Sequence, residues 1–155
     1  MDHDLHVMPV DAGDPEVLAL LEDLTEELAA MGYTAEETFG YTPERLAASA
    51  VELVGARRGG RLVGVGGVEP DGEGGAELKR FYVEPSSRGA GVADAVLDAL
   101  LDVARASGAD VLRLETGDKQ AAAIAFYRRR GFEVVPRFGP YVDSATSVCM
   151  ARRLG

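Results

Sequence analysis

One stretch of the sequence, from the apolar run at 78–83 to a second apolar run at 111–115, limits the possible folds more than any other. Both runs read as strands, and between them lie a glycine-rich turn and a helical pattern from about Gly91 to Ala106. A strand, a helix and a strand with such short joints form a parallel, right-handed βαβ unit. This unit places the glycine turn at the carboxyl end of its first strand, where ligands tend to bind.

The turn itself, Glu84 to Ala93, has the composition of an anion site. Gly89, Ala90 and Gly91 are small enough for a sharp turn that comes close to a ligand. The unpaired N–H groups at the start of the following helix carry partial positive charge, and Arg88 is available as a further donor. The same ten residues could also form a glycine-rich turn that binds nothing, because short glycine motifs are weak signals.

The first half of the chain predicts helices over an antiparallel meander. A strand at 5–10 precedes a helix that Asp14 caps, and a second helix runs from Thr42 to about Ala50. Strands follow at 51–57, 61–68 and 76–83, the first two joined by a glycine hairpin. Within the middle strand, Gly64, Gly66 and Gly67 indicate a bulge or the close approach of another backbone.

After the βαβ unit, the sequence predicts one more helix, at about 119–130 with Gly131 as its cap, and closing strands at 132–135 and 147–151. The fold class is therefore mixed α/β (α+β): about seven strands in one sheet, antiparallel in its N-terminal half and with a parallel βαβ unit in its C-terminal half, and about four helices. At 155 residues we expect a single domain spanning 1–155.

Composition excludes several classes of function. The net charge of −10 is the opposite of a nucleic-acid binder's, and the apolar runs are far short of a membrane span. The acidic N-terminus does not resemble a secretory signal, so we expect a cytoplasmic protein. Cys149 is the single cysteine, and His3 and His6 both lie at the extreme N-terminus, so we expect no disulfide framework, no metal site and no Cys-His or Ser-His catalysis. The acidity would favour cationic partners, but it selects no substrate.

Two motifs at a characteristic separation make the chain resemble the GNAT superfamily of acyl-CoA-dependent N-acyltransferases over nearly its whole length. The family's phosphate-loop pattern is Arg or Gln, two residues, Gly, one residue, then Gly or Ala, and it is matched by Arg88, Gly91 and Ala93. The segment Ala123 to Phe132 is similar to the family's late helix and the strand after it. Together the two motifs favour a functional role for the glycine turn.

The resemblance implies a GNAT-like fold, acetyl-CoA as co-substrate, no metal and a homodimer. The pyrophosphate would bind at the turn, and the pantetheine arm would pair with the edge of the first βαβ strand as an added strand would. The residues concerned are Phe81, Tyr82 and Val83 for the pantetheine arm and Arg88, Gly89, Ala90, Gly91, Val92 and Ala93 for the pyrophosphate. Tyr127 matches the family's usual general acid, since a phenol of pKa about 10 stays protonated at neutral pH.

The base and the acceptor stay open. Glu77 and Glu115 lie on neighbouring strands and could each accept the amine's proton, bind the ammonium group or be solvated charges. We expect Tyr82, Tyr141 and the loops at 33–41 and 136–143 to shape the acceptor side, although aromatic residues there could simply be packing. The sequence predicts transfer of an acetyl group to an unidentified primary amine; the alternative is an acyl-CoA-binding regulatory or interaction module without turnover.

Overall fold

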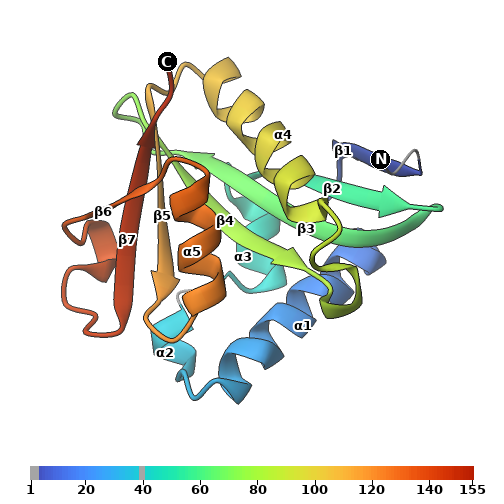
Figure 1. The fold of residues 1–155 in the computed structure, drawn as a ribbon, viewed down its shortest axis with the longest axis horizontal. Helices are drawn as coiled ribbons and strands as arrows, with labels where there is room; N and C mark the ends of the chain where they lie inside the picture. Colours follow the sequence, from blue (N-terminus) through green and yellow to red (C-terminus); the bar gives the residue numbers. More distant parts are fainter. Residues whose placement is uncertain (1–3, 39–40) are drawn as a thin grey trace.

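The computed structural model describes residues 4–38 and 41–155, and its centre is one seven-stranded sheet (Figure 1). The strands lie in the order β1-β2-β3-β4-β5-β7-β6. Every neighbouring pair is antiparallel except β4 and β5, which are parallel, so the predicted mixed sheet is confirmed. The strand bounds are β1 Leu5–Pro9, β2 Glu52–Arg58, β3 Arg61–Pro70, β4 Ala76–Val83, β5 Val111–Gly117, β6 Glu133–Val135 and β7 Ser147–Arg153.

Helices cover both faces of the sheet: α4 and α5 lie on one face, and α1, α2 and α3 lie on the other (Figure 1). Their bounds are α1 Pro15–Ala30, α2 Ala35–Thr38, α3 Pro43–Ala48, α4 Val92–Ala106 and α5 Ala121–Arg129. Four of them were predicted, and the single turn of α2 was not. Its signal is a capping box, in which Thr34 Oγ1 accepts from the Glu37 N–H at 3.2 Å and Glu37 Oε1 accepts from the Thr34 N–H at 2.9 Å.

The α1 side of the sheet has its own apolar core. Asp14 caps α1 by accepting a hydrogen bond from the Glu16 N–H at 2.8 Å, and Pro15 occupies the first turn, as predicted. The helix then buries one stripe of side chains against β3 and β4. Tyr82 of β4 and Leu46 of α3 belong to the same core. The stripe consists of Val17, Leu20, Leu21, Leu24 and Leu28.

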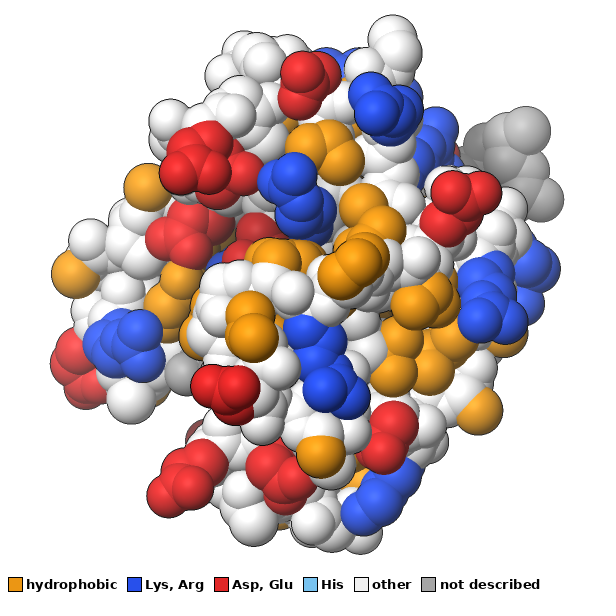
Figure 2. Space-filling model, turned by 90° about the vertical axis from the view of Figure 1, so that its left-hand side faces the viewer, with side chains coloured by type: hydrophobic (Ala, Val, Ile, Leu, Met, Phe, Trp, Pro, Cys, Tyr) orange, Lys and Arg blue, Asp and Glu red, His pale blue; other side chains and the backbone are white. Residues whose placement is uncertain are grey.

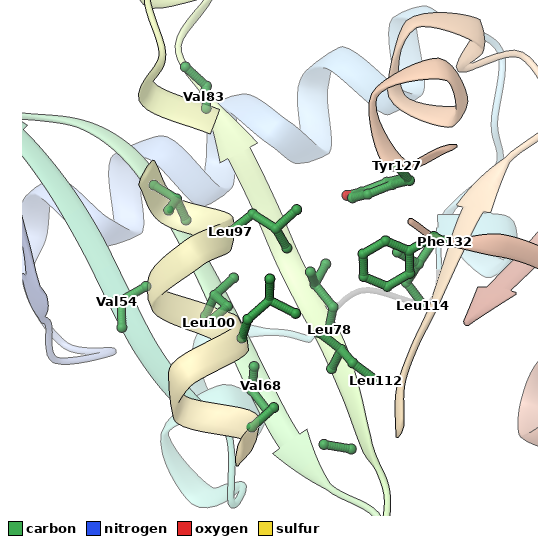
Figure 3. Packing of buried hydrophobic residues seen from close by; sticks show 14 of the residues in the cluster. Val54, Val68, Leu78, Val83, Leu97, Leu100, Leu112, Leu114, Tyr127 and Phe132 are labelled. Carbon is green, nitrogen blue, oxygen red and sulfur yellow. The ribbon is translucent and has the colours of Figure 1, made fainter. Parts of the chain in front are cut away.

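The α4 side holds the larger core, which extends to α5 and β5 (Figure 3). Val96, Leu97 and Leu100 of α4 are completely buried against β2, β3 and β4. The helix comes this close because Gly66 of β3 lacks a side chain: a Cβ built there would lie 2.7 Å from Leu100 Cδ1. The sequence predicted a bulge or the close approach of another backbone at the glycines of this strand; the neighbours are instead side chains, from α4 at Gly64 and Gly66 and from Val51 and Leu53 at Gly67.

A bulge in β4 opens the sheet. Val65 pairs with Tyr82 and Gly67 with Lys79, so two residues of β4, Arg80 and Phe81, oppose Gly66 alone. Arg80 has a φ of +53°, and β4 bends there. Its parallel pairing with β5 consists only of Ala76 with Leu112 and Glu77 with Arg113. Beyond Glu77 the two strands therefore separate and leave a gap in the sheet.

Candidate active site

A cavity of about 780 Å³ occupies the gap between β4 and β5. The three candidate catalytic residues, Tyr127, Glu77 and Glu115, all line it, although they come from α5, β4 and β5. Six of the nine residues that the sequence assigns to the co-substrate line it too: Phe81, Tyr82, Val83, Arg88, Gly89 and Ala93. The fold therefore brings distant parts of the chain to one site.

The glycine turn has the backbone that its sequence predicts. Gly89 and Gly91 have φ values of +79° and +84°, which L side chains rarely adopt. Gly91 is the N-cap of α4 and has no side chain to satisfy the first N–H groups of the helix. Ala90, Gly91 and Val92 do not line the cavity itself, and Val92 is buried in the core at 1 % exposure. The turn thus presents main-chain donors at the cavity's edge, with Val92 anchoring it.

The side chain of Arg88 lies elsewhere than the sequence suggests. Its Nε donates to the Val83 carbonyl at 2.9 Å, its Nη2 donates to Glu27 Oε1 at 2.8 Å, and its guanidinium lies 5.4 Å from the centre of the Tyr82 ring. Glu27 belongs to α1, so this ion pair depends on tertiary packing that the turn sequence does not reveal. Arg88 ties the turn to β4 and α1 instead of standing free as a phosphate donor.

Tyr127 is held by other aromatic rings. Its ring centre lies 6.0 Å from that of Phe81, 5.5 Å from that of Phe126 and 5.6 Å from that of Phe132. The residue is only 6 % exposed, and burial raises the pKa of its phenol above the ordinary value of 10.0. In Figure 3 the hydroxyl points toward β4, and it has no hydrogen-bond partner in the chain as described. The phenol therefore keeps its proton and has it free to donate.

Glu115 lies near the carboxyl end of β5. The Ser147 hydroxyl donates to Glu115 Oε2 at 2.6 Å, and the Ser144 hydroxyl lies 2.7 Å from that of Ser147. Loss of water raises the pKa of the Glu115 carboxyl to about 7; the negative charge of Glu77 adds to the rise, and the Ser147 hydrogen bond opposes it. This carboxyl can exchange a proton near neutral pH.

Glu77 lies in a different environment from that of Glu115. Its Oε2 lies 3.0 Å from Lys79 Nζ and also accepts from the Tyr141 hydroxyl, to which Lys79 donates at 3.3 Å. The Lys79 ammonium is 5.3 Å from the ring centre of Tyr41 and 5.9 Å from that of Tyr141. Burial raises the pKa of both phenols, that of Tyr41 to about 12. Glu77 is thus an ion-paired carboxylate, whereas Glu115 has a hydroxyl as its hydrogen-bond partner.

Sequence reasoning missed Lys79 and Arg80, although both line the cavity. Lys79 could have been found, because residues two apart on a strand share a face and Glu77 was already a candidate. On the acceptor side, Tyr33, Tyr41 and Tyr141 also line the cavity, which places parts of both predicted loops there. Phe39 and Gly40 of the first loop lie outside the described residues.

Outside the cavity, the described residues offer one thiol and a surface of mixed charge. Cys149 is buried on β7, and burial raises the pKa of its thiol. Over residues 4–38 and 41–155, no cluster of metal-binding side chains and no helix fit to span a membrane occurs; His3 lies outside those residues. On the side that carries β6 and β7, acidic, basic and apolar side chains are interspersed (Figure 2). The net negative charge is therefore not concentrated on this side.

Comparison with known proteins agrees with this architecture. Residues 18–132 match the sequence model of the acetyltransferase (GNAT) family. An IAA acetyltransferase of Azospirillum brasilense is 39 % identical over 139 residues, which are 89 % of this chain and 90 % of that protein. A Klebsiella pneumoniae structure assigned to the acyl-CoA N-acyltransferases superposes with a TM-score of 0.82 at 31 % identity, covering 97 % of this chain and 98 % of the other.

A third protein is similar in fold alone. The PaiA N-acetyltransferase of Thermoplasma acidophilum, solved in complex with coenzyme A, gives a TM-score of 0.79 at 18 % identity over 96 % of this chain and 98 % of its own. The family match and the Azospirillum relative together show that the chain belongs to the GNAT acetyltransferase family. It is an acyl-CoA-dependent N-acyltransferase with acetyl-CoA as its co-substrate, as the sequence predicts.

Proposed function

We propose that this enzyme moves an acetyl group from acetyl-CoA directly to a primary amine within the cavity between β4 and β5. The observation that carries the proposal is the pairing of a protonated, unpartnered phenol at Tyr127 with a carboxyl of pKa about 7 at Glu115, both lining that cavity. At neutral pH the phenol carries its proton and the carboxyl can be deprotonated, which are the forms that the acid and the base of this reaction need.

The proposed transfer forms one bond, breaks one bond and moves two protons. The amine nitrogen attacks the thioester carbonyl carbon, a C–N bond forms, and the C–S bond breaks. The departing thiolate takes the Tyr127 proton, and the nitrogen loses a proton to a carboxylate or to water held by one. Tyr127 suits protonation of the thiolate because its hydroxyl has no competing hydrogen bond and its ring is fixed by three aromatic neighbours.

Of the two candidate bases, Glu115 is favoured. A base must be deprotonated at working pH and yet bind a proton strongly enough to draw it from an amine, and a pKa of about 7 satisfies both conditions. Glu77 already accepts from Tyr141 and forms an ion pair with Lys79, so a new proton would displace existing partners. We propose that Glu77 positions Lys79 and Tyr141 at the acceptor side.

Co-substrate binding is proposed to follow the cavity from one end to the other. The main-chain N–H groups from Gly89 to Ala93 would bind the pyrophosphate, since the N-terminus of α4 is uncapped by any side chain. The Arg88 N–H already donates to the Pro85 carbonyl at 3.3 Å. Beyond Glu77, the edge of β4 is unpaired with β5, so Phe81 to Val83 can pair with the pantetheine arm. The Val83 carbonyl already accepts from Arg88 and Tyr82 pairs with Val65 of β3, which leaves Phe81 as the better partner.

We also propose that the enzyme acts in the cytoplasm as a homodimer. The observation that favours self-association is the exposure of two valines: Val134 on the edge strand β6 and Val142 nearby are 53 % and 54 % exposed. Analytical ultracentrifugation would show a dimer; a monomer at all concentrations would contradict this part of the proposal.

The test is the Tyr127→Phe variant, assayed by thiol release on an amine found in a screen over acceptors. We expect kcat to fall by about 100-fold or more, because the thiolate would leave without its proton. The matched control is Tyr82→Phe, which removes another buried phenol that lines the same cavity, and it should retain most of its activity. Acetyl-CoA should raise the melting temperature of both variants. Near wild-type turnover by Tyr127→Phe would remove the acid role, and tight CoA binding with no turnover of any amine would favour a binding module.

A further inference from the structure

The residue at the β4 bulge, Arg80, has a strained backbone. Its φ of +53° is the only positive value of a non-glycine residue in the part of the chain that the structure describes. For such a residue the left-handed conformation is unfavourable, because its Cβ comes too close to a neighbouring carbonyl oxygen. Strain of this kind commonly accompanies functional sites, where it aims a side chain that regular geometry would direct elsewhere.

The bulge directs the Arg80 side chain onto α1. Its Nη2 donates to the Leu21 carbonyl at 3.0 Å and to Thr25 Oγ1 at 2.9 Å, and both acceptors are neutral. Its Nε is buried and has no hydrogen-bond partner. Burial alone lowers the pKa of the guanidinium, and no neighbouring charge offsets this effect. Arg80 is thus a largely desolvated cation without a counter-ion.

The other cations around the cavity differ in this respect. Lys79 lies 3.0 Å from a Glu77 oxygen, and Arg88 lies 2.8 Å from a Glu27 oxygen. Arg80 lines the same cavity but has no carboxylate within ion-pair distance among the described residues. A buried charge lacking a counter-ion is costly, so a ligand that brings a negative group into the cavity gains a strong, charge-assisted hydrogen bond.

This position lies apart from the proposed pyrophosphate site. Arg80 and Glu84 are four strand residues apart, or about 13 Å at 3.3 Å per residue, and the glycine turn lies further along the chain. Arg80 also points to the α1 face, where Leu24, Leu28 and Met31 line the cavity. The negative group that it attracts therefore belongs to the acceptor and not to the phosphates of the co-substrate.

We propose that Arg80 binds a carboxylate of the acceptor, so that the substrates of this enzyme are amines that also carry a carboxylate, as free amino acids do. The inference rests on the proposed function, since it names the acceptor class for the same cavity. The apolar walls from α1 favour an uncharged side chain, so L-leucine and L-phenylalanine are the first acceptors to examine.

Equilibrium binding tests the inference separately from turnover. The wild-type protein is saturated with CoA, which carries no acetyl group, and calorimetry measures the dissociation constants of L-leucine and L-phenylalanine and of their carboxamides. Binding is compared instead of rate because an amino acid and its amide differ in amine basicity. We expect the free acid to bind at least about tenfold more tightly than the amide, since the amide forfeits the charge-assisted bond. Equal binding of acid and amide, or binding of neither, overturns the inference.

Two variants separate an anion site from a structural tie between β4 and α1. Arg80→Gln should lose the preference for the acid, and Arg80→Lys, which keeps the charge, should retain part of it. The matched control is Thr25→Val, which removes a neutral partner of Arg80 but keeps the cation, and the preference should remain. A preference that persists in Arg80→Gln overturns the inference; if that variant fails to fold, the wild-type and Arg80→Lys ratios decide. Turnover of amines without any acid preference would leave the proposed function standing and remove only the acceptor class.

Discussion

Replacing Glu115 by Gln should stabilise the protein in a pH-dependent manner, because the cavity withholds water from this carboxylate. The ordinary pKa of 4.5 rises to about 7 in the folded chain, so between these values the folded state holds a proton that the unfolded state has lost. By linkage, wild-type stability falls as pH rises through this window. Glutamine is nearly isosteric, can accept the Ser147 hydrogen bond and has no proton to lose as the pH rises.

The size of the effect follows from the same shift. One pKa unit is worth about 1.4 kcal/mol, so the free energy of unfolding of the wild type should fall, relative to that of the variant, by at most about 2.5 kcal/mol between pH 5 and pH 8. Since the carboxyl is partly solvated, we expect about 1–2 kcal/mol. Because this change is a difference between two pH values, any constant effect of the substitution cancels.

Urea denaturation of both proteins at pH 5 and pH 8 measures this difference. The control is Glu133→Gln on the edge strand β6, where the side chain is exposed and the variant should follow the wild type at both values. A difference between wild type and Glu115→Gln that is the same at pH 5 and pH 8 would refute the reasoning, since it would mean that the carboxyl titrates alike in both states. The assay needs no acceptor, so it tests the electrostatics of the cavity before any substrate is known.

Two further predictions concern glycines. Gly66→Ala should lower the free energy of unfolding by about 1–3 kcal/mol, since its Cβ would lie 2.7 Å from Leu100 Cδ1; urea denaturation should show this loss, with Gly13→Ala as the nearly neutral control in an exposed turn. Gly91→Ala should weaken acetyl-CoA binding by about tenfold in a calorimetric titration, because a φ of +84° disfavours a side chain and the turn would shift; unchanged affinity would remove the glycine turn from the proposed phosphate site.

The regular elements were predictable because each carries its own local signal. Asp14 and Pro15 mark the start of α1, and Gly131, with a φ of +89°, follows the end of α5. The parallel placement of β4 and β5 followed from the short joints around α4. The single turn of α2 was missed, although Thr34 and Glu37 form its capping box, because a four-residue helix has no apolar periodicity to show.

The site was predictable only where a motif names a residue. Tyr127, Glu77 and Glu115 were identified, and the structure places them around one cavity. What distinguishes the two glutamates comes from tertiary contacts: Lys79 and Tyr141 surround one, and Ser147 approaches the other from β7. No local pattern specifies that distinction.

The surroundings of Arg80 were even less predictable from the sequence. A lysine followed by an arginine in a strand usually reads as one side chain inward and one outward. The bulge opposite Gly66 breaks the alternation, and the positive φ that results depends on how β3 and β4 pair. Its neutral partners on α1 are 55 to 59 residues away in the sequence.

Because β4 and β5 pair at only two residues, the sheet consists of two arms that are hinged at this contact. The two arms, β1–β4 and β5–β7–β6, are joined by main-chain pairing at Ala76 and Glu77, beside the Arg113–Asp71 ion pair and the hydrogen bond from the Asp110 N–H to the Gly74 carbonyl. Further along, Phe81 on one arm meets Phe126 and Tyr127 on the other through ring contacts only, which have no hydrogen-bond geometry to preserve. A small rotation about the joint can therefore change the width of the opening without breaking a strand-to-strand hydrogen bond, but it must stretch the side-chain hydrogen bonds from Tyr141 to Glu77 and from the Lys119 N–H to Tyr33.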